Sequence, residues 1–373
     1  MSDKPVNRRA FVSTAGLAGA AAVLSACGNE SATANCADGV AAEPIEWKMV
    51  TAWPRDFPGL GTGAARLADY IGRLSGGQMT VKLFAGNELV PPLEVFDAVS
   101  RGTADMGHSA SYYWKGKAPA AQFFGSVPFG LTAQEMNAWL YRGGGLELWR
   151  EVYAPHGLVP FPAGNSGTQM GGWFNREIRS LADIKGLKMR IPGIGGEILR
   201  RAGGTPVTLP ASEIYTALQT GTIDATEWVG PWNDLALGLF NAARYYYFPG
   251  WQEPGSALEA MVNKAAWDAL PSHLQAAVEV ACQAVTTDMC AEFTWHNAVA
   301  LKQLREEHDV ELRAFPDEVM AHFQQLTREY LDEQSAADPM FARVHASYRD
   351  CLDMLRPFSA VSEQYLMNLR EPG

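Results

Sequence analysis

The chain has 373 residues, of which 47% are hydrophobic, and this is enough for two ordinary domains with buried cores. Acidic residues outnumber basic residues by 41 to 30, so the formal net charge is −11, and no segment concentrates Lys and Arg. This charge pattern argues against nucleic acid as a partner, because such partners require a basic surface that follows the phosphates.

Residues 1–26 have the composition of an export signal. Arg8 and Arg9 precede Phe11, and a run of small apolar residues follows them. The run is too short to span a membrane stably, so we interpret it as a signal peptide and not as a transmembrane helix. The paired arginines resemble a twin-arginine signal, which serves proteins that are exported in the folded state.

Cys27 ends this run directly after a Leu-Ser-Ala sequence. The pattern resembles the bacterial lipoprotein box, in which the cysteine is acylated and becomes the new N-terminus. The alternative is an incidental or buried cysteine. Residues 27–44 are small and polar, so we expect a flexible tether between a lipid-anchored Cys27 and the folded body of an exported, periplasmic protein.

From residue 45 onward, short strands alternate with helices. We expect strands at residues 45–53, 79–86 and 106–109, and helices at residues 63–77 and 92–102. Pro92 starts the second of these helices, and glycine ends both of them. This order is typical of a βαβ unit, and therefore of a parallel sheet.

A second α/β series follows a well-marked helix. Thr132 and Glu135 stand at capping-box spacing, and the helix they predict ends in the glycine run 143–145. Beyond it we expect strands within 157–164, 168–174 and 187–193, helices within 195–204 and 211–220, and then a short strand. Two α/β lobes in series are the simplest explanation.

The last hundred residues are helical. After Pro271, helical periodicity continues for more than about 30 residues without glycine or proline, whereas an average helix has about 11 or 12 residues. Such a helix can brace two lobes or reach a neighbouring subunit. Residues 316–373 carry Met, Phe, Tyr and Leu at helical spacing, and we interpret this apolar stripe as packing and not as a cofactor site.

The chain shows no motif of a catalytic site. None of its seven histidines lies in a G-x-S-x-G or H-E-x-x-H context, and the sequence has no phosphate-binding Walker loop. Cys282, Cys290 and Cys351 lie in helical patterns without C-x-x-C or histidine spacing, so neither a zinc site nor a redox pair is predicted.

Four polar residues stand where a ligand could be held. Arg190 ends the expected strand at 187–193, and ligands of open α/β sheets bind at the carboxyl ends of strands. Its guanidinium can hold a carboxylate through two parallel hydrogen bonds, or it can form an interdomain ion pair. Gln169 has glycine-rich flanks, and Glu227 and Glu253 lie beside Trp and Gly-Pro turns. Burial of a carboxylate in such a turn is costly unless the group is paired.

Three runs of the sequence resemble a known family. These runs are residues 164–193, 214–234 and 245–253, with the motifs "LKMRIPG" and "GTIDATEWVGP" among them. They resemble the extracytoplasmic solute receptors of tripartite ATP-independent periplasmic (TRAP) transporters. Within that family they are similar to the branch that binds 2-oxo monocarboxylates such as pyruvate, or 2-hydroxy acids such as lactate. The resemblance extends from about Ile45 to the end of the chain.

The resemblance implies a two-lobed α/β periplasmic binding protein fold, with a hinged cleft, a long bracing helix and a helical C-terminal extension. We expect one lobe from residues 45–165 and 252–295, the other from 166–251 and 296–340, and the extension from 341–373. It also implies a membrane permease of the TRAP type as partner and a homodimer formed by exchange of the C-terminal helices.

The resemblance further implies a ligand site with a bridging cation. Arg190 is expected to grip the ligand carboxylate, and Gln169, Glu227, the carbonyl of Trp228 and Glu253 are expected to surround Na⁺ or Ca²⁺. Tyr112 and Tyr113 stand where aromatic residues line the cleft, although ordinary packing at a domain edge explains them equally well. A 2-oxo or 2-hydroxy acid offers a carboxylate oxygen and a C2 oxygen, which a hard cation accepts together with oxygen ligands from the protein.

These features predict a transport receptor and not an enzyme. One alternative is a metal-dependent lyase or aldolase that acts on pyruvate, because a chelated oxo acid also stabilises an enolate. No candidate general base supports that alternative. A second alternative is a ligand-sensing lipoprotein without a permease.

Overall fold

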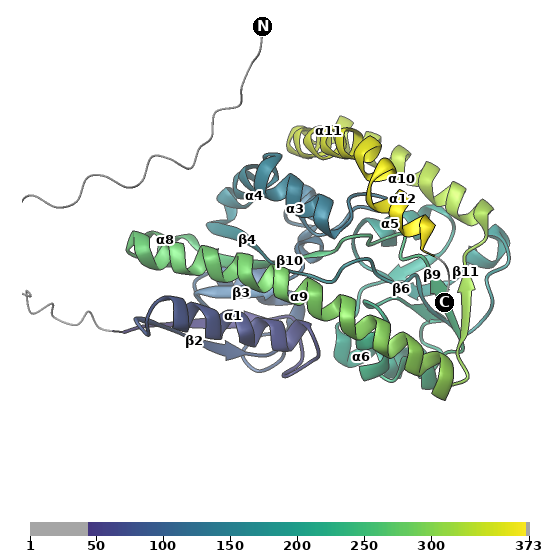
Figure 1. Ribbon diagram of the computed structural model, residues 1–373, viewed down its shortest axis with the longest axis horizontal. Coiled ribbons are helices and arrows are strands. Elements are labelled where there is room, and N and C mark those ends of the chain that lie inside the picture. The colour runs from purple at the N-terminus through teal and green to yellow at the C-terminus, as the bar shows by residue number, and fades with distance from the viewer. Residues whose placement is uncertain (1–43, 371–373) are drawn as a thin grey trace, which may run out of the picture. The chain divides into compact units, whose positions relative to one another are not determined.

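The computed structural model describes residues 44–370 and contains two mixed β-sheets surrounded by helices (Figure 1). We call the part built on the first sheet lobe I and the part built on the second sheet lobe II. The predicted signal peptide, Cys27 and nearly all of the predicted tether lie outside the described residues. Within residues 44–370, no helix is both long and apolar enough to cross a membrane.

The sheet of lobe I has the strand order β2-β1-β3-β10-β4. Strand β10 is antiparallel to both of its neighbours, β3 and β4, whereas β1, β2 and β3 are parallel to one another, as the predicted βαβ unit requires. The strands are β1 (Ile45–Thr51), β2 (Met79–Phe84), β3 (Met106–Ser109), β4 (Leu158–Asn165) and β10 (Ala257–Asn263).

The sheet of lobe II has the strand order β11-β9-β5-β8-β6-β7. Strands β6, β7 and β8 are parallel, so the carboxyl ends of β6 and β8 meet at the same edge. The strands are β5 (Gly172–Phe174), β6 (Lys188–Arg190), β7 (Thr205–Val207), β8 (Ala225–Thr226), β9 (Tyr245–Phe248) and β11 (Glu311–Ala314).

Eight shorter helices cover these sheets and connect their strands. They are α1 (Leu60–Leu74), α2 (Val95–Ser100), α3 (Ala133–Arg142), α4 (Gly145–Tyr153), α5 (Gly193–Arg201), α6 (Ala211–Gln219), α7 (Pro231–Ala236) and α8 (Lys264–Asp268). The predicted capping box is confirmed at α3, where the Thr132 backbone N–H donates to the Glu135 carboxylate at 2.9 Å.

The long helix α9 (Ser272–Glu307) has 36 residues and crosses both lobes (Figure 1). It contacts α1 and β4 of lobe I and α7 of lobe II. The prediction of an unusually long helix after Pro271 is therefore confirmed, and its position agrees with a bracing role.

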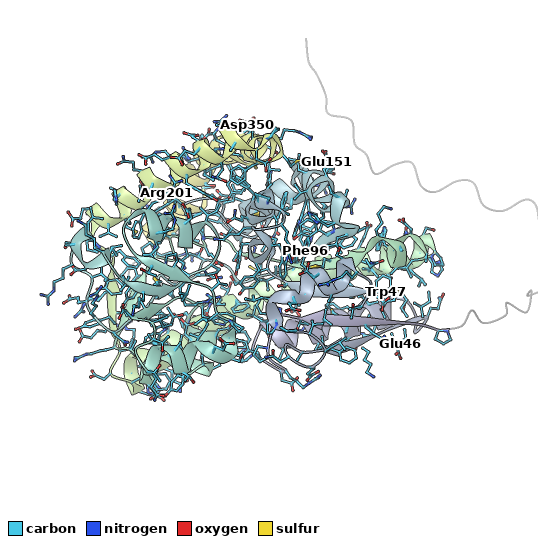
Figure 2. The ribbon with its side chains drawn as sticks, turned by 180° about the vertical axis from the view of Figure 1, so that it is seen from behind. Glu46, Trp47, Phe96, Glu151, Arg201 and Asp350 are labelled. Carbon is cyan, nitrogen blue, oxygen red and sulfur yellow. The ribbon has the colours of Figure 1, made fainter. Side chains whose placement is uncertain are left out.

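Three C-terminal helices also reach both lobes: α10 (Asp317–Ala337), α11 (Pro339–Val361) and α12 (Glu363–Leu369). Helix α10 packs on α5 of lobe II, and α11 packs on α3 and α4 of lobe I. Two ion pairs mark these contacts, Arg201 with Glu333 at 2.6 Å and Arg343 with Glu151 at 2.8 Å. Figure 2 shows Arg201 and Glu151 beside these helices from behind.

The packing interpretation of the C-terminal apolar stripe is only partly right. Phe341, Val344 and Tyr348 are buried against the body of the protein. Phe358 and Val361, by contrast, are 68% and 75% exposed, and large apolar side chains of α12 are exposed as well. The apolar stripe therefore has two parts. Its inner face packs against the body of the protein, and its outer face is exposed.

Candidate functional site

The predicted polar site residues lie together at the boundary of the two lobes, and all of them are buried. Arg190 ends β6, Glu227 and Trp228 follow β8, and Gln169 precedes β5. Glu253 lies between β9 and β10, where the chain passes from lobe II to lobe I. Arg190 and Glu227 thus lie at the carboxyl ends of neighbouring strands, the edge at which ligands of open α/β sheets bind.

Arg190 is held by contacts on three sides of its guanidinium. Nη1 forms an ion pair with the Glu227 carboxylate and donates to the Glu227 carbonyl oxygen at 2.9 Å. Nε donates to the Leu209 carbonyl oxygen at 3.2 Å. The guanidinium lies over the Trp228 ring, 4.8 Å from its centroid. Of the two sequence alternatives for Arg190, the structure shows an ion pair, but with a partner in the same lobe.

The link from Arg190 to lobe I runs through a tyrosine. Arg190 Nη2 donates to the Tyr113 hydroxyl oxygen at 3.2 Å, and Tyr113 lies in a short 3₁₀ segment just after β3. Tyr112 packs edge to face on Tyr113 with ring centroids 4.9 Å apart. Burial raises the pKa of Tyr113 to about 12 and raises the pKa of Tyr112 well above its usual value, so both hydroxyls are neutral.

Glu227 owes its position to the strand end before it. Its backbone N–H donates to the Arg190 carbonyl oxygen at 3.1 Å, which extends the β6–β8 pairing by one residue. Pro231 then starts α7 at a position where its missing N–H costs nothing. Burial raises the pKa of the Glu227 carboxyl well above its usual value, and Arg190 opposes that rise.

Gln169 and Glu253 form the second polar pair. Gln169 Nε2 donates to Glu253 Oε2 at 2.7 Å and to Ser166 Oγ at 3.0 Å. Gly250 makes this approach possible, because a Cβ there would lie 2.1 Å from the Gln169 carbonyl oxygen. Burial raises the pKa of Glu253 to about 7. A cation bound beside this carboxyl would favour its charged form.

Two oxygen atoms of this cluster are buried without a hydrogen-bond partner. They are Gln169 Oε1 and Glu227 Oε2. A buried acceptor without a partner is costly, and an ion is one of the recognised explanations for it. Within residues 44–370 no cluster of three or more His, Cys, Asp or Glu side chains could hold a metal. A cation in this cluster therefore needs amide or carbonyl oxygens besides the two carboxylates, and such a mixed oxygen set fits Na⁺ or Ca²⁺.

A small cavity lies beside the polar cluster. Its apolar wall comes from Trp53, Leu60 and Leu258 of lobe I together with Trp228 and Val229 of lobe II. Tyr112, Tyr113, Ser166 and Gln169 complete the lining. The free space is about 10 Å³, which is the room that one water molecule needs. A three-carbon acid therefore enters only if these side chains, or the lobes that carry them, move apart.

The lobe I part of this apolar wall was not predicted from the sequence. Trp53 and Phe57 each pack edge to face on Trp228, with ring centroids 6.3 Å apart. Trp53 Nε1 donates at 2.8 Å to Nδ1 of the fully buried His108, and burial lowers the pKa of His108 to about 4, which keeps it a neutral acceptor. The only local signal was an aromatic residue at the end of the first strand, which is equally common in cores.

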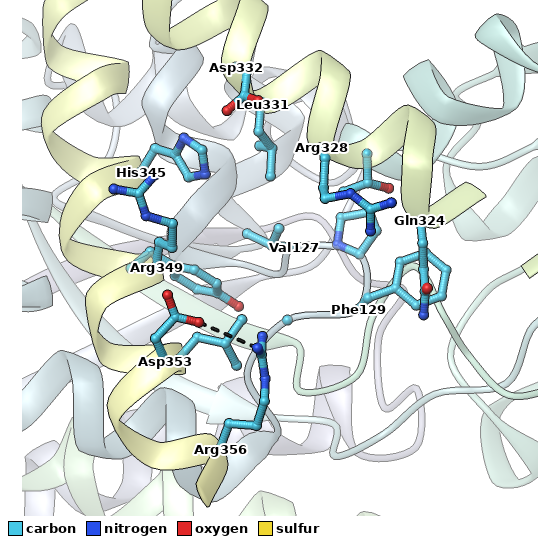
Figure 3. A pocket seen from close by; sticks show the side chains of 15 residues that line it. Val127, Phe129, Gln324, Arg328, Leu331, Asp332, His345, Arg349, Asp353 and Arg356 are labelled. Carbon is cyan, nitrogen blue, oxygen red and sulfur yellow. Dashed lines mark ion pairs between the residues drawn. The ribbon is translucent and has the colours of Figure 1, made fainter. Parts of the chain in front are cut away.

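A second cavity lies apart from these residues, between α10, α11 and the loop 127–130 (Figure 3). Its volume is about 630 Å³, and Arg328, Arg349 and Arg356 are among its lining residues. None of the residues predicted to bind ligand or metal lines it. It is therefore not the site that the sequence predicts.

The chain is similar to characterised binding proteins over nearly its whole length. A monocarboxylate 2-oxoacid-binding periplasmic protein of Nostoc sp. (strain PCC 7120) is 40% identical over 358 residues, which are 96% of this chain and 97% of that protein.

Two crystal structures of TRAP solute-binding proteins superpose on most of the chain. One, from Pseudoalteromonas atlantica T6c, contains sodium and pyruvate; it is 42% identical, has a TM-score of 0.86, and the match covers 88% of this chain and 100% of that chain. The other, from Bordetella bronchiseptica RB50, is a mixed-occupancy dimer with calcium and picolinate in one active site. It is 39% identical, has a TM-score of 0.85, and the match covers 87% and 96% of the two chains.

The model of the family described as bacterial extracellular solute-binding protein, family 7, matches residues 49–338. This match covers far more than half of the chain and agrees with the two-lobed fold. The chain therefore belongs to the DctP family of solute-binding proteins, which includes the solute receptors of TRAP transporters.

Proposed function

We propose that this protein is a TRAP receptor that binds a small 2-oxo or 2-hydroxy monocarboxylate, such as pyruvate or lactate, together with Na⁺ or Ca²⁺. One observation carries the proposal. Glu227 Oε2 and Gln169 Oε1 are buried acceptors without partners, and a buried arginine lies beside them. This pairing of a cationic group with free oxygens suits a ligand that is an anion at one end and a metal ligand at the other.

Different residues bind the ligand carboxylate and the cation. Arg190 binds the ligand carboxylate through its guanidinium, and the Trp228 ring below supports that group. Glu227, Glu253, Gln169 and the carbonyl of Trp228 hold the cation, which supplies a positive charge to the carboxylate and the C2 oxygen of the ligand. Tyr112 and Tyr113 close the opposite side with neutral hydroxyls that can donate hydrogen bonds.

Charge explains why a monocarboxylate fits best. One arginine and two glutamates leave the protein groups at −1, so a monocarboxylate with Ca²⁺ gives a neutral site and one with Na⁺ gives about −1. Apart from Arg190, no lysine or arginine among the described residues belongs to the polar cluster or lines the cavity. A second carboxylate on the ligand would be buried against the apolar wall without a partner, which is costly.

Binding requires that the two lobes close around the ligand. Arg190 and Glu227 belong to lobe II, and Tyr113 and Trp53 belong to lobe I. A ligand that contacts both favours the closed state and shifts the population toward it. In the closed state Arg190 must share its guanidinium between Glu227 and the ligand carboxylate.

Calorimetry with metal-stripped protein tests the proposal. We expect pyruvate to bind in the presence of CaCl₂ or NaCl and to bind at least about 10-fold more weakly in chelator, because the cation completes the ligand's contacts. Pyruvate should be recovered unchanged after incubation, since the receptor binds without turnover. Undiminished binding in chelator would contradict the cation bridge, and consumption of pyruvate would support the lyase alternative.

The outer face of the C-terminal helices supports a homodimer. Met354, Phe358 and Val361 of α11 and Tyr365, Leu366, Met367 and Leu369 of α12 are exposed. Apolar patches of this kind mark interaction sites. Sedimentation should show a dimer for the wild type and a monomer for Phe358→Asp combined with Val361→Asp. Val280→Asp, at an exposed apolar position of α9, is the matched control and should remain dimeric.

The predicted export route and anchor complete the proposal. A twin-arginine-like signal in residues 1–26 and acylation of Cys27 would place the receptor on the periplasmic side of a membrane, near a TRAP permease. Mass spectrometry of the mature N-terminus should show a diacylglycerol adduct that Cys27→Ser abolishes. An unmodified Cys27 in the mature wild type would contradict the anchor.

A further inference from the structure

Asn233 of lobe II forms a hydrogen bond to lobe I, and neither partner in this bond is one of the proposed ligand-binding residues. Its side chain is fully buried in α7, and Nδ2 donates to the Pro58 carbonyl oxygen of lobe I at 2.9 Å. Pro58 lies between Phe57, which packs on Trp228, and Leu60, which lines the cavity. The bond therefore attaches the loop 54–60, which contributes Leu60 to the cavity wall and Phe57 to the contact with Trp228, to lobe II.

The donor side of this bond is rigidly held. Next to Asn233, the buried Asp234 accepts hydrogen bonds from Trp173 Nε1 of β5 at 3.0 Å and from the Tyr246 hydroxyl of β9 at 2.7 Å. On the other side, the Trp232 backbone N–H donates to Asn297 Oδ1 of α9 at 3.0 Å. Helix α7 is thus fixed to the sheet of lobe II and to the bracing helix, so Asn233 is preorganised to meet lobe I.

Asn233 also lies shortly after Glu227 and Trp228, which are proposed to hold the cation. Glu227, Trp228 and Asn233 lie within one short stretch of chain, and the Trp228 ring packs against Phe57 of the loop that Asn233 holds. The hydrogen bond from Arg190 to Tyr113 also reaches lobe I, but it uses groups that the proposed function assigns to ligand binding. Asn233 and Pro58 neither line the cavity nor belong to the polar cluster to which the proposed function assigns the ligand and the cation. A change at Asn233 can therefore alter closure without altering a contact to the ligand.

We propose that Asn233 is a positioning residue that sets ligand affinity by holding the 54–60 loop over the occupied cavity. This inference rests on the proposed function only for the identity of the ligand. The bond joins the two lobes in the closed arrangement, with or without ligand, so its loss should destabilise that arrangement and speed ligand release. The association rate should be unchanged, because the ligand docks before the lobes close. One hydrogen bond of this kind corresponds to about a 5- to 10-fold change in affinity.

The test compares Asn233→Leu and Asn233→Asp with wild type in the full mature protein. Stopped-flow tryptophan fluorescence with pyruvate and CaCl₂ should show release that is about 5- to 10-fold faster in both variants, with an unchanged association rate. Asn175→Leu is the matched control, because Asn175 Nδ2 donates to the Leu218 carbonyl oxygen within lobe II. Its release rate should equal that of wild type. Release from the Asn233 variants at the wild-type rate overturns the inference.

Hydrogen exchange separates this inference from the proposed function. In ligand-free protein, the amides of residues 54–60 should exchange at least about 5-fold faster in Asn233→Leu than in wild type or Asn175→Leu, because the loop loses its attachment. If wild type does not bind pyruvate, the proposed function fails, and exchange alone decides the role of Asn233. Equal exchange of residues 54–60 in all three proteins then overturns it.

Discussion

Arg190→Met is expected to lower pyruvate affinity by at least about 100-fold, because it removes the only guanidinium in the polar cluster. Truncation of one partner in a buried charged pair costs about 2–5 kcal/mol of binding free energy, which corresponds to this loss. The measurement is calorimetry with pyruvate in saturating CaCl₂. Arg201→Met is the matched control: Arg201 forms its ion pairs with Glu197 and Glu333, away from the site, and its variant should bind like wild type.

The same substitution should also lower the melting temperature. Arg190 and Glu227 are both 1% exposed, so loss of the arginine leaves a buried carboxyl without its partner. Removal of one member of such a pair typically costs about 3–5 kcal/mol. Adding Glu227→Gln to Arg190→Met should restore the melting temperature but not pyruvate binding. If the double variant regains binding, Arg190 does not bind the ligand carboxylate.

Glu227→Gln is expected to make pyruvate binding insensitive to CaCl₂ and NaCl. The substitution keeps the shape of the side chain, but it removes the charge of the group whose Oε2 has no partner in the structure. A hard cation prefers carboxylate oxygen, so the amide should hold it much more weakly. Wild-type affinity should fall at least about 10-fold in chelator, whereas the variant should bind equally weakly with and without metal.

Glu259→Gln is the matched control for Glu227→Gln. Glu259 is also a buried carboxyl, and it accepts hydrogen bonds from Trp114 Nε1 at 2.5 Å and from the Tyr153 hydroxyl at 2.6 Å. It neighbours Leu258 in β10, but alternate side chains of a strand point to opposite faces, so Glu259 does not face the cavity. Its variant should keep the full response to metal. A metal response that survives in Glu227→Gln would remove Glu227 from the cation site.

Local signals in the sequence were sufficient where an element depends on its own residues. The capping pair Thr132 and Glu135 defined the start of a helix, and Pro271 followed by an uninterrupted helical pattern defined α9. Caps and helix periodicity act within a few residues, so they can be recognised without the fold. The position of Arg190 at a strand end was recognisable for the same reason.

Elements that depend on distant partners were not predicted. Strand β11 pairs with β9, and β10 lies between β3 and β4, although long stretches of chain separate these partners. The short strand expected after the helix at 211–220 is confirmed as β8, which has only two residues. The strand expected within 168–174 is shorter in the structure, where β5 begins at Gly172. The residues before Gly172 turn toward Glu253 and do not pair in the sheet.

The sequence by itself determined the family, the α/β order, the long helix and a list of polar residues that could meet a ligand, because composition, caps and motifs are local properties. Only the tertiary structure decided that Arg190 pairs with Glu227 and that Trp53 and Phe57 meet Trp228 across the lobes. It also decided that two oxygens of the cluster are left without partners and that Phe358 faces outward. These facts depend on which surfaces are buried against each other, and burial is set by contacts between residues far apart in the chain.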